Sequence, residues 1–209
     1  HDKITRELSN GDYDSKFLWK QSKVYVKELT QSKELTTLSF DDSIEEKRYT
    51  DESELHCWHF DHTFGKSVRG VNFLTALIEV GTMRLPCAVE FVKKDLWKKD
   101  PKTGKEKRKS SVSKNELFRK MLRECNGKFR FDYVLADSWY SSNENMNCCK
   151  KELNNDFIMA LKSNRKVALS LENKQNKEYI SIETLQLGQQ TVEVWFEELD
   201  FPLLLTKQV

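Results

Sequence analysis

The sequence has few of the residues that interrupt regular structure, with only 7 glycines and 3 prolines among 209 residues. No apolar run approaches the roughly 20 residues that a membrane-spanning helix needs, so we expect no membrane segment. The five cysteines are an odd number without C-x-x-C spacing, which argues against a disulfide framework and favours a reducing, cytoplasmic compartment. The composition, 38% hydrophobic and 33% charged, instead indicates a globular chain with one well-filled core.

Both ends of the sequence are abrupt. The chain begins at His1 without an initiator methionine or a signal-peptide pattern, and it ends in a strand-like segment, 201–209. We therefore expect a fragment of a longer protein.

The net charge is only +2, but the charges are unevenly distributed. Residues 93–109 carry nine Lys or Arg against three acids, whereas residues 41–61 carry eight acids against two basic residues. This contrast is typical of a protein that holds cations in one place and polyanions in another.

Apolar periodicity and turn residues predict a mixed order of strands and helices. Residues 1–30 look helical with a cap at Ser15, and a second helix with a capping box at Ser113 and Glu116 closes at Gly127. A third helix is capped by Ser141 or Ser142, and 93–110 is expected to be a basic loop. Predicted strands cover 35–40, 69–80, 83–92 (with an edge or bulge at Pro86), 131–136 and 157–161.

This order predicts an α/β fold (α+β, mixed sheet) with a ribonuclease-H-like core. We expect an N-terminal helical segment (1–30), a partial catalytic core (31–164) and a truncated β-rich insertion (165–209). The insertion is predicted from short strands at 179–182, 192–196 and 201–205.

Two aspartates follow two of the apolar strands, Asp42 after 35–40 and Asp137 after 131–136. In the predicted sheet these strands are neighbours, which would bring together two carboxylates that are 95 positions apart. Close carboxylates repel each other unless a cation lies between them, and carboxylate oxygens suit Mg²⁺ and Mn²⁺. Taken by position alone, ordinary strand-end aspartates remain the alternative.

The sequence segments around these two aspartates resemble the motifs of a known protein family. The segment 38–47 (LSFDDSIEEK) is similar to the first-acid motif of bacterial insertion-sequence transposases, the DDE group with a β-strand insertion in its core. Segments 58–62 (WHFDH), 66–72 (KSVRGVN), 134–140 (VLADSWY) and 157–165 (FIMALKSNR) also resemble that group. Together these motifs extend the resemblance over most of the chain.

The resemblance implies a metal-dependent DNA strand-transfer enzyme. It assigns catalysis and Mg²⁺ (or Mn²⁺) binding to Asp42 and Asp137, with Asp41 as the weaker candidate for the first acid. The family's third acid, a Glu on a helix after the β insertion, is expected beyond Val209, so the fragment alone should be inactive or nearly so. Double-stranded DNA (transposon ends and target), a homodimer in the DNA complex and a nucleoid-associated location are also implied.

Basic residues supply candidate DNA contacts, because phosphate binding gives salt-dependent, sequence-independent affinity. A solvated charged loop is the alternative. Trp97, Trp139 and Tyr140 could stack on DNA or pack in the protein. The candidates are Lys98, Lys99, Lys105, Lys107, Arg108, Lys109, Lys162 and Arg165.

Two rival functions are compatible with the sequence. A nuclease of the same superfamily would hydrolyse DNA without strand transfer, and fold alone does not separate the two activities. A non-catalytic, DNA-binding relic of a transposon would bind DNA without using the acids. A zinc site at His56, Cys57, Asp61 and His62 is disfavoured, because no second cysteine pair completes a tetrahedral set.

Overall fold

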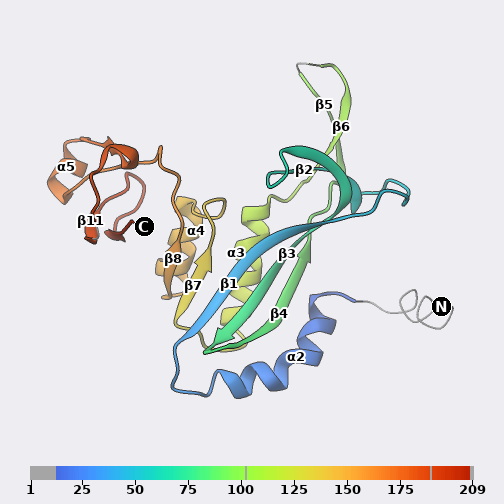
Figure 1. The fold of residues 1–209 in the computed structure, drawn as a ribbon, viewed down its shortest axis with the longest axis horizontal. Helices are drawn as coiled ribbons and strands as arrows, with labels where there is room; N and C mark the ends of the chain where they lie inside the picture. The colour runs from blue at the N-terminus through green and yellow to red at the C-terminus, as the bar shows by residue number, and fades with distance from the viewer. Residues whose placement is uncertain (1–12, 102, 189, 208–209) are drawn as a thin grey trace.

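The computed structural model describes residues 13–101, 103–188 and 190–207, so the first twelve residues of the predicted helical segment lie outside it. Helix α2 (Ser15–Leu29) packs along β4 at the edge of the main sheet (Figure 1). Its cap is Asp14, whose side chain accepts the Phe17 amide at 2.9 Å, rather than Ser15. The Ser15 hydroxyl instead accepts a hydrogen bond from the Val89 amide at 3.3 Å.

The centre of the molecule is a mixed six-stranded sheet. Its order is β2-β3-β1-β7-β8, with β4 also paired to β3. Strand β1 is antiparallel to β3 and parallel to β7, and β7 is parallel to β8. This is the strand order of a ribonuclease-H-like core, as the sequence predicted. The strands are β1 (Thr36–Glu46), β2 (His56–Asp61), β3 (Lys66–Val80), β4 (Met83–Phe91), β7 (Tyr133–Ala136) and β8 (Asp156–Met159).

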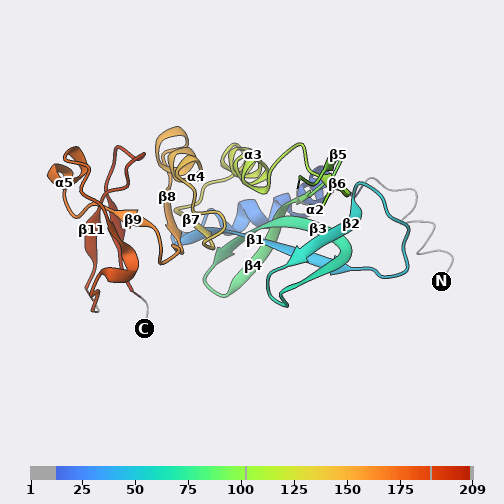
Figure 2. The same ribbon diagram turned by 90° about the horizontal axis from the view of Figure 1, so that it is seen from above.

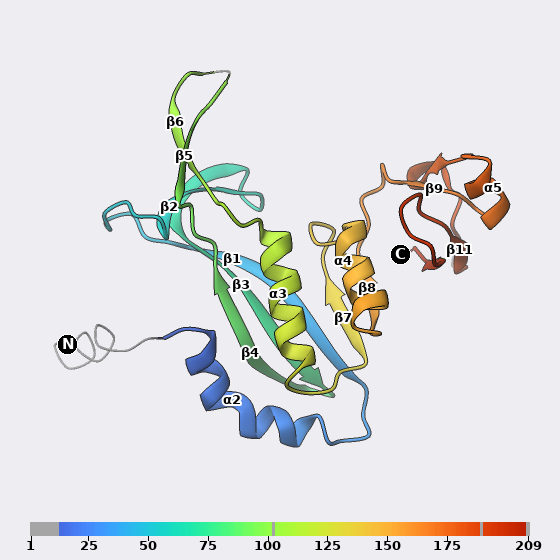
Figure 3. The same cartoon turned by 180° about the vertical axis from the view of Figure 1, so that it is seen from behind.

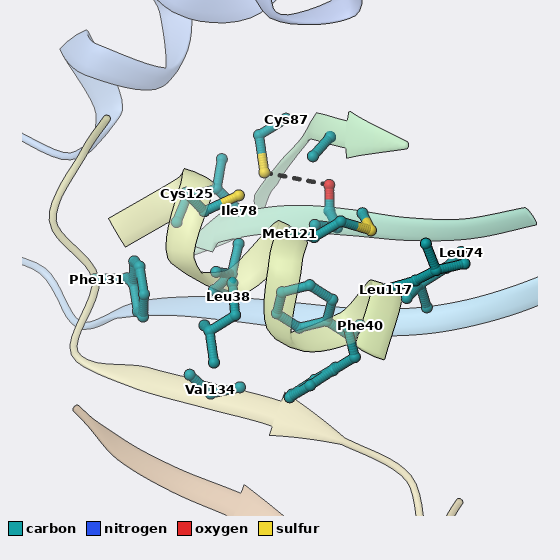
Figure 4. Packing of buried hydrophobic residues seen from close by; sticks show 14 of the residues in the cluster. Leu38, Phe40, Leu74, Ile78, Cys87, Leu117, Met121, Cys125, Phe131 and Val134 are labelled. Carbon is teal, nitrogen blue, oxygen red and sulfur yellow. Dashed lines mark hydrogen bonds between the residues drawn. The ribbon is translucent and has the colours of Figure 1, made fainter. Parts of the chain in front are cut away.

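Helices α3 (Lys114–Asn126) and α4 (Asn143–Asn147) cover one face of this sheet (Figures 2 and 3). The predicted capping box of α3 is present. The buried face of the helix consists of Leu117, Phe118, Met121, Leu122 and Cys125. Helix α4 is capped by Ser142 and continues as a π-helix, η1 (Cys148–Glu152). Figure 4 shows α3 packed on the strands through Phe40, Leu74, Leu117 and other apolar residues.

A β-bulge and a close approach of two strand backbones shape the long antiparallel strands. Pairing of β3 with β4 shifts between Ala76 and Leu77, so a bulge occurs next to Pro86, as predicted. The extra residue is Cys87, whose thiol donates to the Ala76 carbonyl at 3.2 Å (Figure 4). At the other end of β3, Gly70 lies so close to β1 that a Cβ there would collide with the Glu45 carbonyl oxygen.

The C-terminal part is rich in short strands around a second apolar cluster, which includes Val167, Val194 and Phe196. Strands β9 and β10 form one pair and β11 and β12 another. The boundaries predicted at residues 30/31 and 164/165 stay predictions. The elements are β9 (Lys166–Val167), α5 (Leu171–Gln175), β10 (Ile180–Ser181), the 3₁₀ turn η2 (Ile182–Thr184), β11 (Val192–Val194) and β12 (Leu203–Leu205).

No helix in the described part of the chain is long and apolar enough to cross a membrane.

Candidate active site

Asp42 lies inside β1, not at its end. The sequence predicted a strand that stops at Phe40, but β1 continues to Glu46 because β3 pairs with it as far as Gly70. Only the pairing with β7 stops at Phe40 and Ala136. Since side chains alternate along a strand, Asp42 projects from the same face as buried Phe40, toward the N-terminal end of α3.

Both carboxylate oxygens of Asp42 have protein partners. The Tyr140 hydroxyl donates to Oδ1 at 2.9 Å, and the Lys114 ammonium forms an ion pair with Oδ2. The Asp42 and Lys114 side chains are only about one fifth exposed, so this pair is partly shielded from solvent. Asp42 is therefore held in one orientation by two groups from different parts of the chain.

Neither Lys114 nor the role of the Tyr140 hydroxyl was predicted from the sequence. A weak signal existed for each. Lys114 is the first residue of α3, where the helix dipole disfavours a cation unless a carboxylate is near. A buried tyrosine usually needs a hydrogen-bond acceptor for its hydroxyl.

Asp137 follows β7 directly and is exposed. Its Oδ1 accepts the Trp139 amide at 2.9 Å, and its carbonyl accepts the Tyr140 amide at 3.2 Å, which closes a tight turn. The turn directs Tyr140 back into the core, where its ring stacks on Phe118 with centroids 5.4 Å apart. One turn thus holds the second acid and orients the tyrosine that binds the first.

The negative charges of the acids act on the same two neighbouring groups. Burial raises the pKa of Tyr140, and the negative charges of Asp42, Asp137 and Asp41 raise it further. The pKa of Asp41 is also raised, first by burial and then by the charges of Asp42 and Asp137, although the Asp42 amide and Lys114 oppose this. Asp41 accepts that amide at 2.9 Å. The fold therefore concentrates negative charge just past the point where the pairing of β1 with β7 stops.

The chemistry of these donors fits a divalent metal in part. Carboxylate oxygens are the ligands that Mg²⁺ and Mn²⁺ prefer, and the Lys114 ammonium already supplies a positive charge at Asp42. Asn72, on β3, lies on the same face of the sheet as Asp42. Its buried side-chain oxygen has no hydrogen-bond partner. Among residues 13–101, 103–188 and 190–207, however, no three His, Cys, Asp or Glu side chains are grouped closely enough to hold a metal. The described residues thus offer a partial ligand set.

His59 is a further titratable residue, on β2, and was not a candidate from the sequence. It is buried, and its Nε2 lies 3.4 Å from the Cys57 sulfur. Burial lowers the pKa of His59 to about 4, assisted by the positive charges of Lys94 and Lys114. The imidazole is therefore neutral at pH 7 and does not add positive charge to the site.

The segment predicted as a basic loop is a β-hairpin, which corrects the sequence interpretation. Strands β5 (Leu96–Lys99) and β6 (Glu106–Lys109) pair antiparallel, and the hairpin projects from the body of the molecule (Figure 1). Its strands were missed because they are almost entirely exposed and show no apolar alternation. The hairpin carries six of the DNA-contact candidates: Lys98, Lys99, Lys105, Lys107, Arg108 and Lys109.

Not all of these candidates have a free charge. Arg108 lies over the Trp97 ring, 4.4 Å from its centroid, and pairs with Glu52 at 3.2 Å. Lys107 pairs with Asp100 at 2.8 Å. Arg108 therefore stabilises the base of the hairpin, while the other lysines leave the hairpin strongly cationic.

The last two basic candidates differ from each other. Lys162 follows β8 and its ammonium lies 5.6 Å from the Trp139 ring centroid, beside the acids. Arg165 is half-buried; it donates to the Ser141 carbonyl and to Asn143 Oδ1, the latter at 2.6 Å. Arg165 also lies over Phe196, so its role in this fold is to join the core to the C-terminal part.

Comparison with protein families gives a match over most of the chain. A family model described as "DDE superfamily endonuclease" matches residues 1–179. The chain belongs to this family. In the DDE domain, Asp42 lies in β1 and Asp137 directly follows β7, the strand that pairs parallel with β1. DDE enzymes generally use divalent metal ions.

Two solved structures are also similar at low sequence identity. One is a piggyBac transposase synaptic complex with hairpin DNA: 10% identity, TM-score 0.41, over 77% of this chain and 28% of that chain. The other is a Drosophila P element transposase strand transfer complex: 10% identity, TM-score 0.29, over 72% of this chain and 36% of that chain. The DDE domain thus spans about a third of each of these chains. No curated protein matches the sequence.

Proposed function

We propose that this chain is the catalytic-core portion of a DNA transposase of the bacterial insertion-sequence type. Its reaction would be hydrolysis of a phosphodiester at a transposon end, followed by attack of the freed 3′-hydroxyl on a second phosphodiester. The observation that carries the proposal is the placement of two acids on neighbouring parallel strands of a DDE domain: Asp42 within β1 and Asp137 directly after β7, just past the point where the pairing of these strands stops.

The proposal gives each residue at this end of the sheet a role. Asp42 and Asp137 would hold Mg²⁺ or Mn²⁺, which when bound supplies activation of the attacking oxygen and stabilisation of the leaving one. Tyr140 and Lys114 orient the Asp42 carboxylate through its two oxygens. Lys114 must release Oδ2 if that oxygen is to become a ligand.

The proposed substrate is double-stranded DNA, both transposon ends and target. The cationic hairpin supports this, because clustered lysines bind phosphates without regard to sequence. A homodimer in the DNA complex and a nucleoid location follow only from the resemblance to insertion-sequence transposases.

Metal binding is the first test. We would measure Mn²⁺ binding by calorimetry for the chain, for the Asp42→Ala/Asp137→Ala double variant, and for Glu28→Ala, which removes an exposed carboxylate on α2. We expect weak binding by the unaltered chain and by Glu28→Ala, and none by the double variant. Equal binding by all three would show that the two acids are not the site.

DNA joining separates the transposase from its rivals. For a chain extended to include the expected third acid, incubation of labelled transposon ends with a target plasmid and Mg²⁺ should give joined products on a gel. Cleavage without joining would indicate a nuclease of the same fold. Salt-sensitive DNA binding without metal binding would indicate a non-catalytic relic.

A further inference from the structure

An exposed aromatic cluster lies next to the two acids and takes no part in the roles above. Phe60, His62 and Trp139 are all exposed. Their rings form a chain, with centroids 4.9 Å apart for Phe60 and His62 and 5.2 Å apart for His62 and Trp139. The cluster joins the β2–β3 turn to the turn that follows β7.

Trp139 is fixed relative to the second acid while its ring remains accessible. Its backbone amide donates to Asp137 Oδ1 at 2.9 Å, so the backbone of Trp139 is held next to that carboxylate. The residue is nevertheless 44% exposed, although indole rings are usually largely buried. A fixed, accessible ring beside the acids is a surface on which a flat ligand can stack.

Two lysine ammonium groups lie near the Trp139 ring. The ammonium groups of Lys162 and Lys114 lie 5.6 and 5.8 Å from its centroid. An aromatic face with adjacent lysines matches the chemistry of a nucleotide, whose base stacks and whose phosphate pairs with a cation. Inside a duplex both faces of each base are covered by its neighbours, so an unpaired base offers Trp139 the most accessible face.

We propose that Trp139, flanked by His62 and Lys162, binds one unpaired nucleobase of a DNA strand, with Lys162 binding the adjoining phosphate. This site rests on the proposed function, because it assumes that DNA reaches the acids. It would hold the strand at a fixed distance from Asp137 and favour DNA ends with an unpaired nucleotide over fully paired duplex.

The test uses two DNA ligands of the same sequence, one fully paired and one with a single-stranded 3′ extension that carries 2-aminopurine. Binding is measured by fluorescence anisotropy, and stacking by quenching of the 2-aminopurine fluorescence. The proteins are the unaltered chain, Trp139→Ala, Trp139→Phe and the control Tyr49→Ala, which removes a ring that is 99% exposed. Circular dichroism checks that each variant is folded.

We expect Trp139→Ala to bind the extended DNA about 5- to 150-fold more weakly and to lose the quenching, since this is the usual range for one base–aromatic stack. Its binding to the paired duplex should change by less than about twofold, because the duplex offers no unpaired base to the ring. Trp139→Phe should retain most of the affinity and quenching, and Tyr49→Ala should behave as the unaltered chain.

Three outcomes would overturn the site. Equal affinity and quenching in Trp139→Ala, or an equal loss on both DNA ligands, would exclude stacking of an unpaired base. A dimer that becomes monomeric in Trp139→Ala on gel filtration would show that the ring contacts a second copy instead. If the unaltered chain binds neither DNA, the proposed function fails together with the site; every other failure concerns the site alone.

Discussion

The acidic end of the sheet and the β5–β6 hairpin carry opposite charges and are built in opposite ways. Asp42 has both oxygens bound by side chains from other segments, and Tyr140, one of those partners, is fully buried. The hairpin is almost wholly exposed, and local strand pairing with the Arg108–Trp97 contact stabilises it. Groups that must be placed accurately are thus fixed by tertiary packing, while groups that need only a charge are left on a projecting arm.

The largest effect should follow from weakening the packing beneath the acids. Phe118 is fully buried against Phe40 and Tyr140, with ring centroids 4.5 and 5.4 Å away. We expect Phe118→Ala to lower the free energy of unfolding by about 3–5 kcal/mol in urea titrations, because it leaves a cavity. The same substitution at exposed Phe64 should cost less than about 0.5 kcal/mol. Similar costs at both positions would show that the packing beneath the acids does not stabilise the fold more than an exposed ring does.

Removal of the Tyr140 hydroxyl should lower the free energy of unfolding less than removal of the Phe118 ring. Tyr140→Phe removes the hydrogen bond to Asp42 and should lower the free energy of unfolding by about 1–2 kcal/mol. The matched control is Tyr133→Phe, at a half-buried position in β7. If urea titration shows no difference between the two variants, the Tyr140 hydroxyl does not stabilise Asp42.

The acidic end should also respond to pH through His59. Its pKa is about 4 in the folded protein and about 6.5 in an unfolded chain, so the unfolded state binds a proton first. The contribution of neutral His59 is complete above pH 6.5 and is lost as pH falls toward 4. We expect a loss of about 1–2 kcal/mol over that window by urea unfolding, allowing for partial solvent screening. His59→Gln should remove this part of the pH dependence; an unchanged profile would show that another group titrates.

The hairpin should give the smallest change in stability but a clear change in DNA binding. Replacement of Lys98, Lys99, Lys105 and Lys109 by Gln should alter the free energy of unfolding by less than about 0.5 kcal/mol. The slope of log affinity for duplex DNA against log salt should fall by about 0.9 for each phosphate that the variant no longer neutralises. The control replaces four exposed lysines of α2 (Lys16, Lys20, Lys23 and Lys27) by Gln. Equal slope changes in both variants would mean that net charge, not the hairpin, binds DNA.

The parts of the fold that sequence predicted are those with strong local signals. Helix α3 has a capping box at Ser113 and Glu116 and a continuous apolar face, so its bounds follow from the sequence. The bulge beside Pro86 was also predicted, because proline cannot donate to the strand ladder. The length of β1 was not predicted, because the polar second half of this strand has no apolar alternation and is extended through its pairing with β3.

The candidate site divides in the same way. Asp42 and Asp137 were chosen from local motifs, whereas the Lys114–Asp42 pair joins residues that are 72 positions apart. Such a contact depends on where α3 lies on the sheet, which no local pattern specifies. The basic candidates were chosen by charge alone, and charge did not distinguish exposed Lys162 from Arg165, which links two parts of the molecule.

Gly70 gives a way to recognise variants of this gene that encode a misfolded chain. Any side chain at this position would collide with the Glu45 carbonyl oxygen. Glu45 lies in the second half of β1, where β3 is the only strand of the main sheet that pairs with β1. In a saturation library selected for folded protein, codon 70 should therefore return glycine only. A variant gene that retains both aspartate codons but has lost this glycine is therefore expected to encode a chain that does not fold, although inspection of the acids alone would count it as intact.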